Sequence, residues 1–219
     1  MTGHRSFFLD EALDGYVQAH SPAVDEVQQS LIEATAALGP LARMQVAPDQ
    51  AAFLAVLVAA LRPSFAVEVG TFTGFSSLAI ARALPTGGRL LCCDVSTEWT
   101  DIARRHWAMA GVDDRIDLVV APALETLQAL PPDQHVDFAF LDADKTGYLA
   151  YYEEIVPRLS PHALIAVDNV RWSGRVLDAG ADDADTVALR AFNDHVIADD
   201  RVTSVLLSVG DGVNLIRLA

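Results

Sequence analysis

Short, β-branched apolar runs alternate with segments of helical periodicity from Phe65 to the end of the chain, and this alternation constrains the fold more than any other feature. The first five expected strands cover residues 66–70, 89–94, 116–120, 137–143 and 163–169. Repeated strand–helix–strand units predict a parallel sheet that is covered by helices on both faces. Because such crossovers are right-handed, we expect a doubly wound α/β fold.

The end of the chain shows a different pattern. Two further expected strands, 203–209 and 212–218, flank a Gly-Asp-Gly turn, which predicts an antiparallel hairpin. The sheet would then have seven strands, mostly parallel, and would end in this hairpin. The region before the first strand is helical by pattern, with a start signal at Ser21–Pro22 and a buried helix at 51–61 that is too short to span a bilayer.

A length of 219 residues suits one domain, 1–219, in which a helical N-terminal segment, 1–64, precedes the sheet core, 65–219. The net charge of −15 argues against a nucleic-acid partner, whose binding relies on clustered Lys and Arg. No basic start followed by an apolar core opens the chain, so we expect a cytoplasmic protein without a signal peptide or membrane partner. The adjacent Cys92 and Cys93 would point to opposite faces of a strand, which predicts two reduced packing residues.

The ends of the expected strands are where ligands bind in open α/β sheets. Gly70 and Gly74 follow the first strand in a G-x-x-x-G spacing, which is not the nicotinamide dinucleotide fingerprint. Asp94 closes the second strand and could accept both ribose hydroxyls of a nucleoside, although it or Ser96 could instead cap a helix. Glu68 needs a partner if it is buried, and a ligand ammonium and a structural hydrogen bond are equal candidates. The glycine turn and the acidic strand end together predict an adenosine-type ligand.

Acidic side chains also follow the next two strands of the expected sheet. Asp142 and Asp144 lie two residues apart, hence on one face, and Asp168 and Asn169 end the following strand. Lys145, the only lysine in the sequence, comes directly after Asp144. Carboxylate and amide oxygens suit Mg²⁺, Mn²⁺ or Ca²⁺ rather than zinc. The sequence therefore predicts a metal site here, with helix and turn capping as the alternative explanation.

Five segments carry a resemblance to a known family: "MQVAPDQAAFL", "VEVGTFTGFSSLAIA", "FLDADKTGYLAYYE", "DNVRWSGRV" and "VGDGVNLIRL". From about Met44 onward the chain resembles the cation-dependent, S-adenosylmethionine-dependent O-methyltransferases of the caffeoyl-CoA and catechol type. The "LDADK" and "DNVxWxG" pair makes the resemblance specific, whereas the glycine turn alone would indicate only the wider methyltransferase superfamily. The resemblance implies a Rossmann-like methyltransferase fold and a core that binds S-adenosylmethionine and a metal.

The resemblance also implies roles for individual residues. The metal, Mg²⁺ before Mn²⁺ or Ca²⁺, would be held by Asp142, Asp168 and Asn169. Lys145 would be the catalytic base or would stabilise charge. The implied contacts of the cosubstrate S-adenosylmethionine are Val46, Glu68, Gly70, Thr71, Ser76, Asp94, Ala123 and Asp144. Plant members carry an N-terminal lysine for the acyl-CoA substrate and an Asn where Ser173 stands, so this chain argues against acyl-CoA acceptors.

We therefore expect divalent-cation-dependent methyl transfer to a hydroxyl of a catechol-type small molecule. A vicinal diol can chelate one cation, which would lower the pKa of the reacting hydroxyl, and Lys145 could accept its proton. The alternatives are a metal-independent methyltransferase, a nicotinamide-dependent oxidoreductase, which the glycine spacing disfavours, and a non-catalytic binder of the cosubstrate. Apolar surfaces on the terminal hairpin and the N-terminal helices predict a homodimer.

Overall fold

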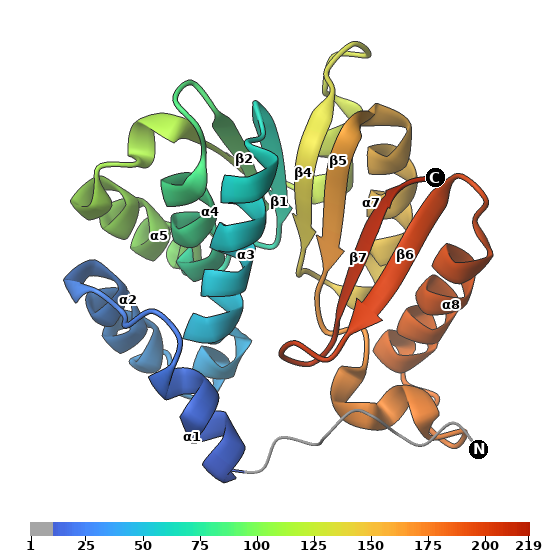
Figure 1. The fold of residues 1–219 in the computed structure, drawn as a ribbon, viewed down its shortest axis with the longest axis horizontal. Helices are drawn as coiled ribbons and strands as arrows, with labels where there is room; N and C mark the ends of the chain where they lie inside the picture. Colours follow the sequence, from blue (N-terminus) through green and yellow to red (C-terminus); the bar gives the residue numbers. More distant parts are fainter. Residues whose placement is uncertain (1–10) are drawn as a thin grey trace.

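A single mixed sheet organises the molecule (Figure 1). The structure is a computed structural model that describes residues 11–219. The strands are β1 Phe65–Val69, β2 Arg89–Asp94, β3 Ile116–Val120, β4 Val136–Leu141, β5 Leu159–Val167, β6 Val202–Leu207 and β7 Val213–Leu218. They lie in the order β3-β2-β1-β4-β5-β7-β6, and only β7 pairs antiparallel with its two neighbours. The predicted seven-stranded, mostly parallel sheet that ends in a hairpin is confirmed.

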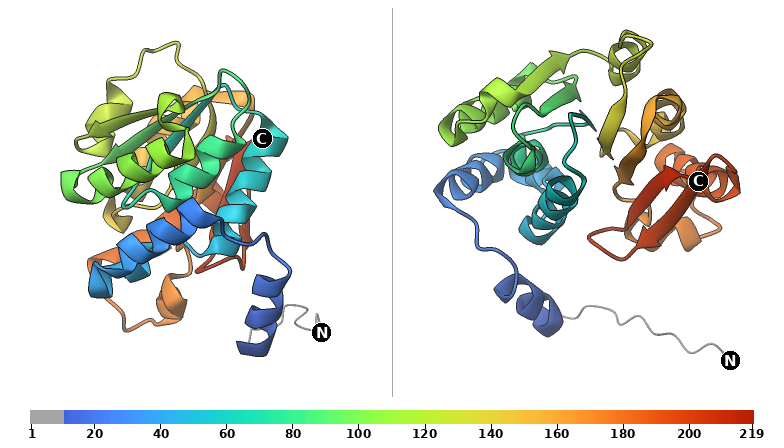
Figure 2. Two further views of the ribbon diagram at one scale, coloured as in Figure 1. Left: turned by 90° about the vertical axis from the view of Figure 1, so that its left-hand side faces the viewer. Right: turned by 45° about the horizontal axis from the view of Figure 1, so that its top comes forward.

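Helices connect the strands and cover both faces. The α-helices are α1 Glu11–Ala19, α2 Glu26–Ala36, α3 Pro48–Leu61, α4 Phe75–Ala83, α5 Thr97–Ala110, α6 Ala123–Gln128, α7 Tyr148–Ile155 and α8 Ala184–Ala198. Short 3-10 helices are η1 Gly39–Met44, η2 Asp113–Arg115, η3 Lys145–Gly147, η4 Val156–Arg158 and η5 Trp172–Leu177. Figure 2 shows α2 to α5 (blue to green) gathered on one side and α7 and α8 (orange to red) on the other.

The start of α2 differs from the prediction. The Ser21–Pro22 signal does not begin a helix, because α2 begins at Glu26 and Asp25 is its N-cap. The Asp25 carboxylate accepts from the Gln28 amide at 2.9 Å, and the Gln28 side chain accepts from the Asp25 amide at 3.1 Å. This reciprocal capping box satisfies two backbone donors, which a proline cannot do.

Two hydrophobic cores lie on the two faces of the sheet. One contains Tyr148 and Phe192 from α7 and α8, and the other contains Leu54 and Trp107 from α3 and α5. The adjacent cysteines of β2 divide between these cores, Cys93 in the first and Cys92 in the second, and both are free thiols. The prediction of two unbonded packing cysteines is confirmed, because neighbouring strand residues point to opposite faces.

Helix α3 is only half buried, although its sequence predicted a buried helix. Leu54 and Val58 are fully buried, whereas Val56 is 67% exposed. Among the described residues, the helical run Gly39–Leu61 is long and apolar enough to cross a membrane by length and composition. That run is two helices, η1 and α3, separated by a short extended segment, and the inner face of α3 packs against α4. Within the described residues, Val56 on the outer face of α3 is therefore left exposed.

Candidate active site

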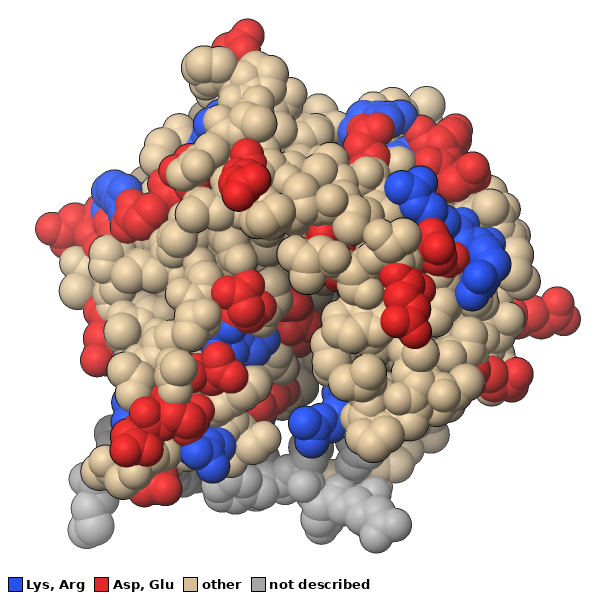
Figure 3. All heavy atoms as spheres, turned by 180° about the vertical axis from the view of Figure 1, so that it is seen from behind, with Lys and Arg blue, Asp and Glu red and all other residues tan. Residues whose placement is uncertain are grey.

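A cavity of about 1230 Å³ opens at the carboxyl ends of the central strands. Its walls are the loops that follow β1 to β5, together with Asp211 of the terminal hairpin turn and residues 43–47 and Gln50 from the N-terminal segment. This is the edge of the sheet at which the sequence predicted ligands. The volume exceeds the ~300–1,000 Å³ usual for one small ligand, so two reactants fit side by side. Figure 3 shows the face of the molecule opposite to that of Figure 1, with a hollow near its middle bordered by acidic and basic side chains.

The turn after β1 requires glycine at two positions. Gly70 has φ +91°, and a Cβ there would lie 2.0 Å from the carbonyl oxygen of Asp142. Gly74 has φ +88° and begins α4, and a Cβ there would lie 2.5 Å from the Cβ of Ala103. Larger residues would therefore clash as well as strain the backbone. The close contact of Gly70 with Asp142 places the glycine turn directly against the acidic loop after β4.

Asp94 stabilises the glycine turn from the neighbouring strand. Its Oδ2 accepts from the backbone amides of Thr71 at 2.9 Å and Phe72 at 2.7 Å, and its Oδ1 accepts from the Ser96 amide at 2.8 Å. The N-cap of α5 is Ser96, whose hydroxyl accepts from the Trp99 amide, and not Asp94. Each carboxylate oxygen has two lone pairs, so Asp94 can shape the turn and still accept from a ligand.

Glu68 lies on β1 just before this turn, and its side chain is part of the buried core. Its side chain is fully buried, Oε1 has no partner, and Oε2 is 3.5 Å from the thiol of Cys92. Burial raises the pKa of Glu68 to about 8, and the nearby Asp142 adds a smaller increment. Glu68 does not line the cavity, whereas all the other residues that the sequence indicated do.

The residues predicted to hold a metal meet at the ends of β4 and β5. Asp168 is 2% exposed, and its two oxygens accept from the Asn169 amide at 2.7 Å and from Nε2 of Gln50 at 2.6 Å. Burial, and then the charge of Asp142, raise the pKa of Asp168 to about 7. Asn169 has a left-handed backbone conformation, with φ +56°. Its side-chain oxygen and that of Asp142 both accept from Lys145.

Lys145 is buried among these groups. Its Nζ donates to Asp142 Oδ1 at 3.1 Å, to Asn169 Oδ1 at 2.7 Å and to the Tyr148 hydroxyl at 2.6 Å. The Tyr148 hydroxyl in turn donates to the backbone carbonyl of Asp168 at 3.1 Å. Because an ammonium has three hydrogens, all the donors of Lys145 are used.

Three contributors to the site were missed in the sequence. Gln50 orients Asp168, and Tyr151 donates from its hydroxyl to Asp144 Oδ1 at 2.6 Å. The third, Tyr148, binds Lys145 and the Asp168 carbonyl through its hydroxyl, contacts that no pattern in the sequence indicated. The "PDQ" triplet and the tyrosine pair sit inside segments that carry the family resemblance, but nothing in their spacing indicates which side chains they contact.

The turn of the terminal hairpin supports the loop after β5. The amides of Val170 and Arg171 donate to the carbonyls of Gly212 at 3.1 Å and Asp211 at 3.0 Å. The Ser173 amide donates to both carboxylate oxygens of Asp211 at 2.8 Å. The loop that carries Asp168 and Asn169 is therefore held in place by residues some forty positions later in the chain.

Comparison with known proteins identifies the family. The family model described as O-methyltransferase matches residues 18–219. The chain belongs to the O-methyltransferase family. This methyltransferase is 42% identical to the probable caffeoyl-CoA O-methyltransferase 2 of Dictyostelium discoideum, over 92% of this chain and 89% of that protein. It is 35% identical to the caffeoyl-CoA O-methyltransferase of Eucalyptus gunnii, over 98% of this chain and 90% of the relative.

Solved structures agree with this assignment. The O-methyltransferase from Bacillus cereus in complex with SAH superposes with a TM-score of 0.88 at 31% identity, over 95% of this chain and 97% of that one. The O-methyltransferase TomG from Streptomyces achromogenes in complex with SAM gives 0.87 at 27% identity, over 95% and 96%. The predicted family, the Rossmann-like methyltransferase fold and the predicted enzyme class, an S-adenosylmethionine-dependent O-methyltransferase, are confirmed.

The donor set of the methyltransferase fits a hard divalent cation. Carboxylate and amide oxygens are the ligands that Mg²⁺ and Mn²⁺ take, and the described cavity-lining residues include no histidine and a single cysteine, Cys93, which belongs to β2 and not to the ends of β4 and β5. Oxygens of Asp142 and Asn169 converge on one positively charged nitrogen, which shows that they favour positive charge at a common point. Burial is the main cause of the raised pKa of Asp168, and the charge of the half-buried Asp142 adds to it.

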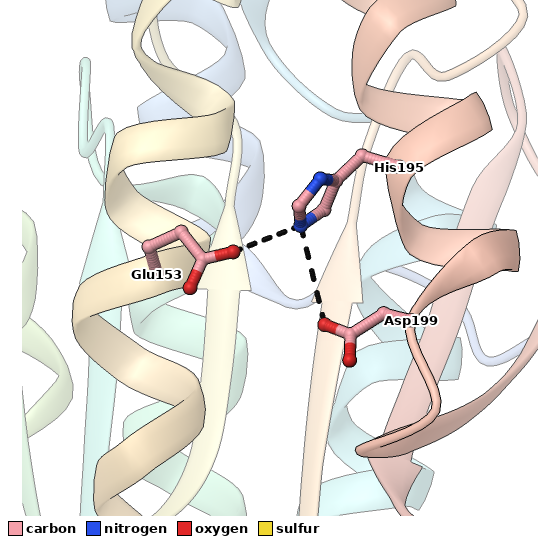
Figure 4. A group of neighbouring side chains, drawn as sticks. All are labelled: Glu153, His195 and Asp199. Atoms are coloured by element: carbon pink, nitrogen blue, oxygen red, sulfur yellow. Dashed lines mark hydrogen bonds and ion pairs between the residues drawn. The ribbon is translucent and has the colours of Figure 1, made fainter.

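A second group of metal-ligating side chains lies between α7 and the end of α8 (Figure 4). His195 Nε2 is 2.8 Å from Glu153 Oε1 and 4.0 Å from Asp199 Oδ2. Arg201 Nη2 already pairs with Glu153 at 2.9 Å and with Asp199 at 2.6 Å. Since the guanidinium of Arg201 already binds both carboxylates, we interpret this group as an ion-pair network that ties α7 to α8 and not as a second cation site.

Proposed function

We propose that this methyltransferase transfers a methyl group from S-adenosylmethionine to a hydroxyl of a catechol-type small molecule, with a divalent cation bound at Asp142, Asp168 and Asn169. The observation that carries this proposal is the convergence of Asp142 Oδ1 and Asn169 Oδ1 on one buried cationic nitrogen at the wall of the large cavity. Mg²⁺ fits best, and Mn²⁺ and Ca²⁺ take the same oxygens.

The proposed cosubstrate site lies on the glycine-turn side of the cavity. Asp94 would accept from the ribose through Oδ1, which accepts only the Ser96 amide and keeps a lone pair, whereas the two amides of the turn use both lone pairs of Oδ2. The other proposed cosubstrate contacts on this wall are Val46, Gly70, Thr71, Ser76, Ala123 and Asp144. Glu68 would act from behind the wall, because it is buried beneath the turn and does not reach the cavity.

The proposed acceptor site lies on the side of the acidic loops. When bound, the cation would lower the pKa of a chelating diol and fix its position. Lys145 would first release its own ammonium proton to solvent and then take the proton of the reacting hydroxyl, and the phenolate oxygen would bond to the methyl carbon as the carbon–sulfur bond breaks. The products are the methyl ether and S-adenosylhomocysteine, and the proton passes from Lys145 to solvent. Holding both reactants in one cavity supplies much of the acceleration.

A small catechol is proposed in preference to an acyl-CoA ester, although several relatives are named for caffeoyl-CoA. This chain lacks the N-terminal lysine of the plant enzymes that it resembles, and it has Ser173 where they have an Asn. In this chain the Ser173 amide donates to the Asp211 carboxylate, so Ser173 contacts the turn of the terminal hairpin.

The test is methyl transfer to a simple catechol after exhaustive metal removal. We expect no product in excess chelator and full recovery on adding Mg²⁺ or Mn²⁺. Asp168→Ala should abolish turnover while cosubstrate affinity by calorimetry stays nearly unchanged, because Asp168 lies on the acceptor side. Full activity in chelator would instead favour a metal-independent methyltransferase.

We also propose that the enzyme is a homodimer. Val56 on α3 and Val205 and Leu206 on the edge strand β6 are large apolar side chains that are 67%, 51% and 47% exposed. Large apolar side chains left exposed on a folded chain often belong to an interface. Light scattering at micromolar concentration should give the dimer mass, and Val56→Asp should shift it toward the monomer. A monomeric wild type would contradict the proposal.

A further inference from the structure

The ammonium of Lys145 lies at the point where the proposed metal ligands converge. Two of its three hydrogen-bond partners, Asp142 Oδ1 and Asn169 Oδ1, are atoms assigned above to the divalent cation. Its side chain is 7% exposed, and the third partner, Tyr148, is fully buried. The ammonium therefore provides positive charge to a buried acidic cluster that would otherwise be costly to maintain.

The backbone of the two loops around Lys145 is held by hydrogen bonds to the sheet. The Asp142 amide donates to the Val69 carbonyl at 2.9 Å, and the Asp168 amide donates to the Leu141 carbonyl at 2.9 Å, so both loops continue the hydrogen bonding of the sheet. Lysine, in contrast, has a flexible four-carbon stem. Any change in this cluster is therefore taken up by the lysine side chain and not by the loops.

A divalent ion bound to these two oxygens would place a second cation next to the ammonium. Mg²⁺ binds oxygen at about 2.0–2.1 Å. An ammonium that kept its hydrogen bonds to the same two atoms would lie within a few ångströms of the ion, where like charges repel strongly in a partly buried site. One of the two cations has to leave.

We propose that Lys145 is an internal cation that competes with the divalent ion for Asp142 and Asn169, and that ion binding displaces its Nζ toward the cavity. This inference rests on the proposed function, which places the ion at these residues. Tyr148 remains as the tether, because its hydroxyl donates to the Asp168 carbonyl and keeps a lone pair for Nζ. Ion binding thus converts Lys145 from a counter-ion into a group available to the acceptor.

The first test uses the fact that Lys145 is the only lysine in the sequence. Protein made with ¹³C,¹⁵N-lysine gives one set of lysine side-chain NMR signals, which needs no assignment. We expect the ¹³Cε and ¹⁵Nζ signals to shift on titration with diamagnetic Mg²⁺ and to saturate together with ion binding measured by calorimetry. Signals that stay in place while Mg²⁺ saturates the protein would overturn the proposal.

The second test is Mn²⁺ affinity, measured by electron paramagnetic resonance without cosubstrate or acceptor. Removing a competing charge at contact distance should tighten binding, so we expect Lys145→Met to lower the dissociation constant at least about tenfold. Arg43→Met is the matched control, because Arg43 is an exposed cationic residue of the same cavity wall, and its loss should change the constant less than about threefold.

The outcomes separate this inference from the proposed function. If the wild type binds no divalent ion, the metal assignment fails and the competition fails with it. If the wild type binds Mn²⁺ but Lys145→Met binds it equally or more weakly, the competition alone is wrong. Thermal melting monitored by circular dichroism establishes that the variants are folded, and the NMR titration needs no variant.

Discussion

Glu68→Gln should make the stability of the enzyme less dependent on pH. Glu68 is fully buried, one of its oxygens has no partner, and its pKa rises from an ordinary 4.5 to about 8. Because the folded state holds this proton more tightly than the unfolded state, the contribution to stability is complete below about pH 4.5 and is lost as pH rises through about 8. Glutamine matches the neutral acid in shape and does not ionise.

The magnitude follows from the linkage between proton binding and folding. One pKa unit corresponds to about 1.4 kcal/mol, so the wild type should lose about 2–3 kcal/mol of unfolding free energy relative to Glu68→Gln between about pH 6 and about pH 9. Asp168, whose pKa is about 7, loses its proton in the same direction but does so in both proteins. The difference between the two proteins therefore isolates Glu68.

The assay is urea unfolding at several pH values, in chelator, without cosubstrate and at one protein concentration. Glu98→Gln is the matched control, since Glu98 is an exposed carboxylate on α5 and its removal should leave the pH profile parallel to wild type. Parallel profiles for wild type and Glu68→Gln would show that Glu68 is ionised in the folded state at neutral pH, and the argument from burial would be wrong.

Three further substitutions test the proposed site. Asp94→Ala should weaken cosubstrate binding by roughly 1.5–3 kcal/mol, the range for hydrogen bonds to a charged group, and unchanged affinity by calorimetry would remove Asp94 from the ribose site. Lys145→Met should lower turnover about 10²-fold or more, and Lys145→Arg should not rescue it because guanidinium does not accept a proton; recovery with Arg would mean that charge alone is needed. Gly70→Ala should destabilise the fold by roughly 2–4 kcal/mol in urea unfolding, because its Cβ would overlap the Asp142 carbonyl; a near-neutral effect would show that the turn can move.

The strands and the acidic residues at their ends could be predicted from the sequence, because they follow from hydrophobic periodicity and from where the strands end. All seven strands were found because β-branched runs alternate with helices, and the segments 89–94 and 116–120 match β2 and β3 residue for residue. The acidic residues of the site were found because the ends of neighbouring parallel strands, β4 and β5, meet at one edge.

Features that depend on contacts between distant residues, or on competition between local signals, could not be predicted from these patterns. The Asp25 capping box prevailed over the Ser-Pro signal because it satisfies more backbone donors. Glu68 was expected at the cosubstrate, and the structure places its side chain in the core beside Cys92 and outside the cavity lining, since nothing in a strand's sequence says how deeply the cavity reaches. Gln50 meets Asp168 across more than a hundred residues of chain, and no local pattern records such a contact.

The position of β7 has a consequence for how the active site opens. β7 is the last strand in the sequence, yet it lies between β5 and β6 and supplies the only sheet contact of β6 within the described residues. The turn beside it also holds the amides of Val170 and Arg171. Local opening of the hairpin would therefore release the loop of Asp168 and Asn169 in the same event. We expect these two amides to exchange hydrogen for deuterium at the rate of the β7 amides, so the lifetime of an intact catalytic loop equals the lifetime of the hairpin.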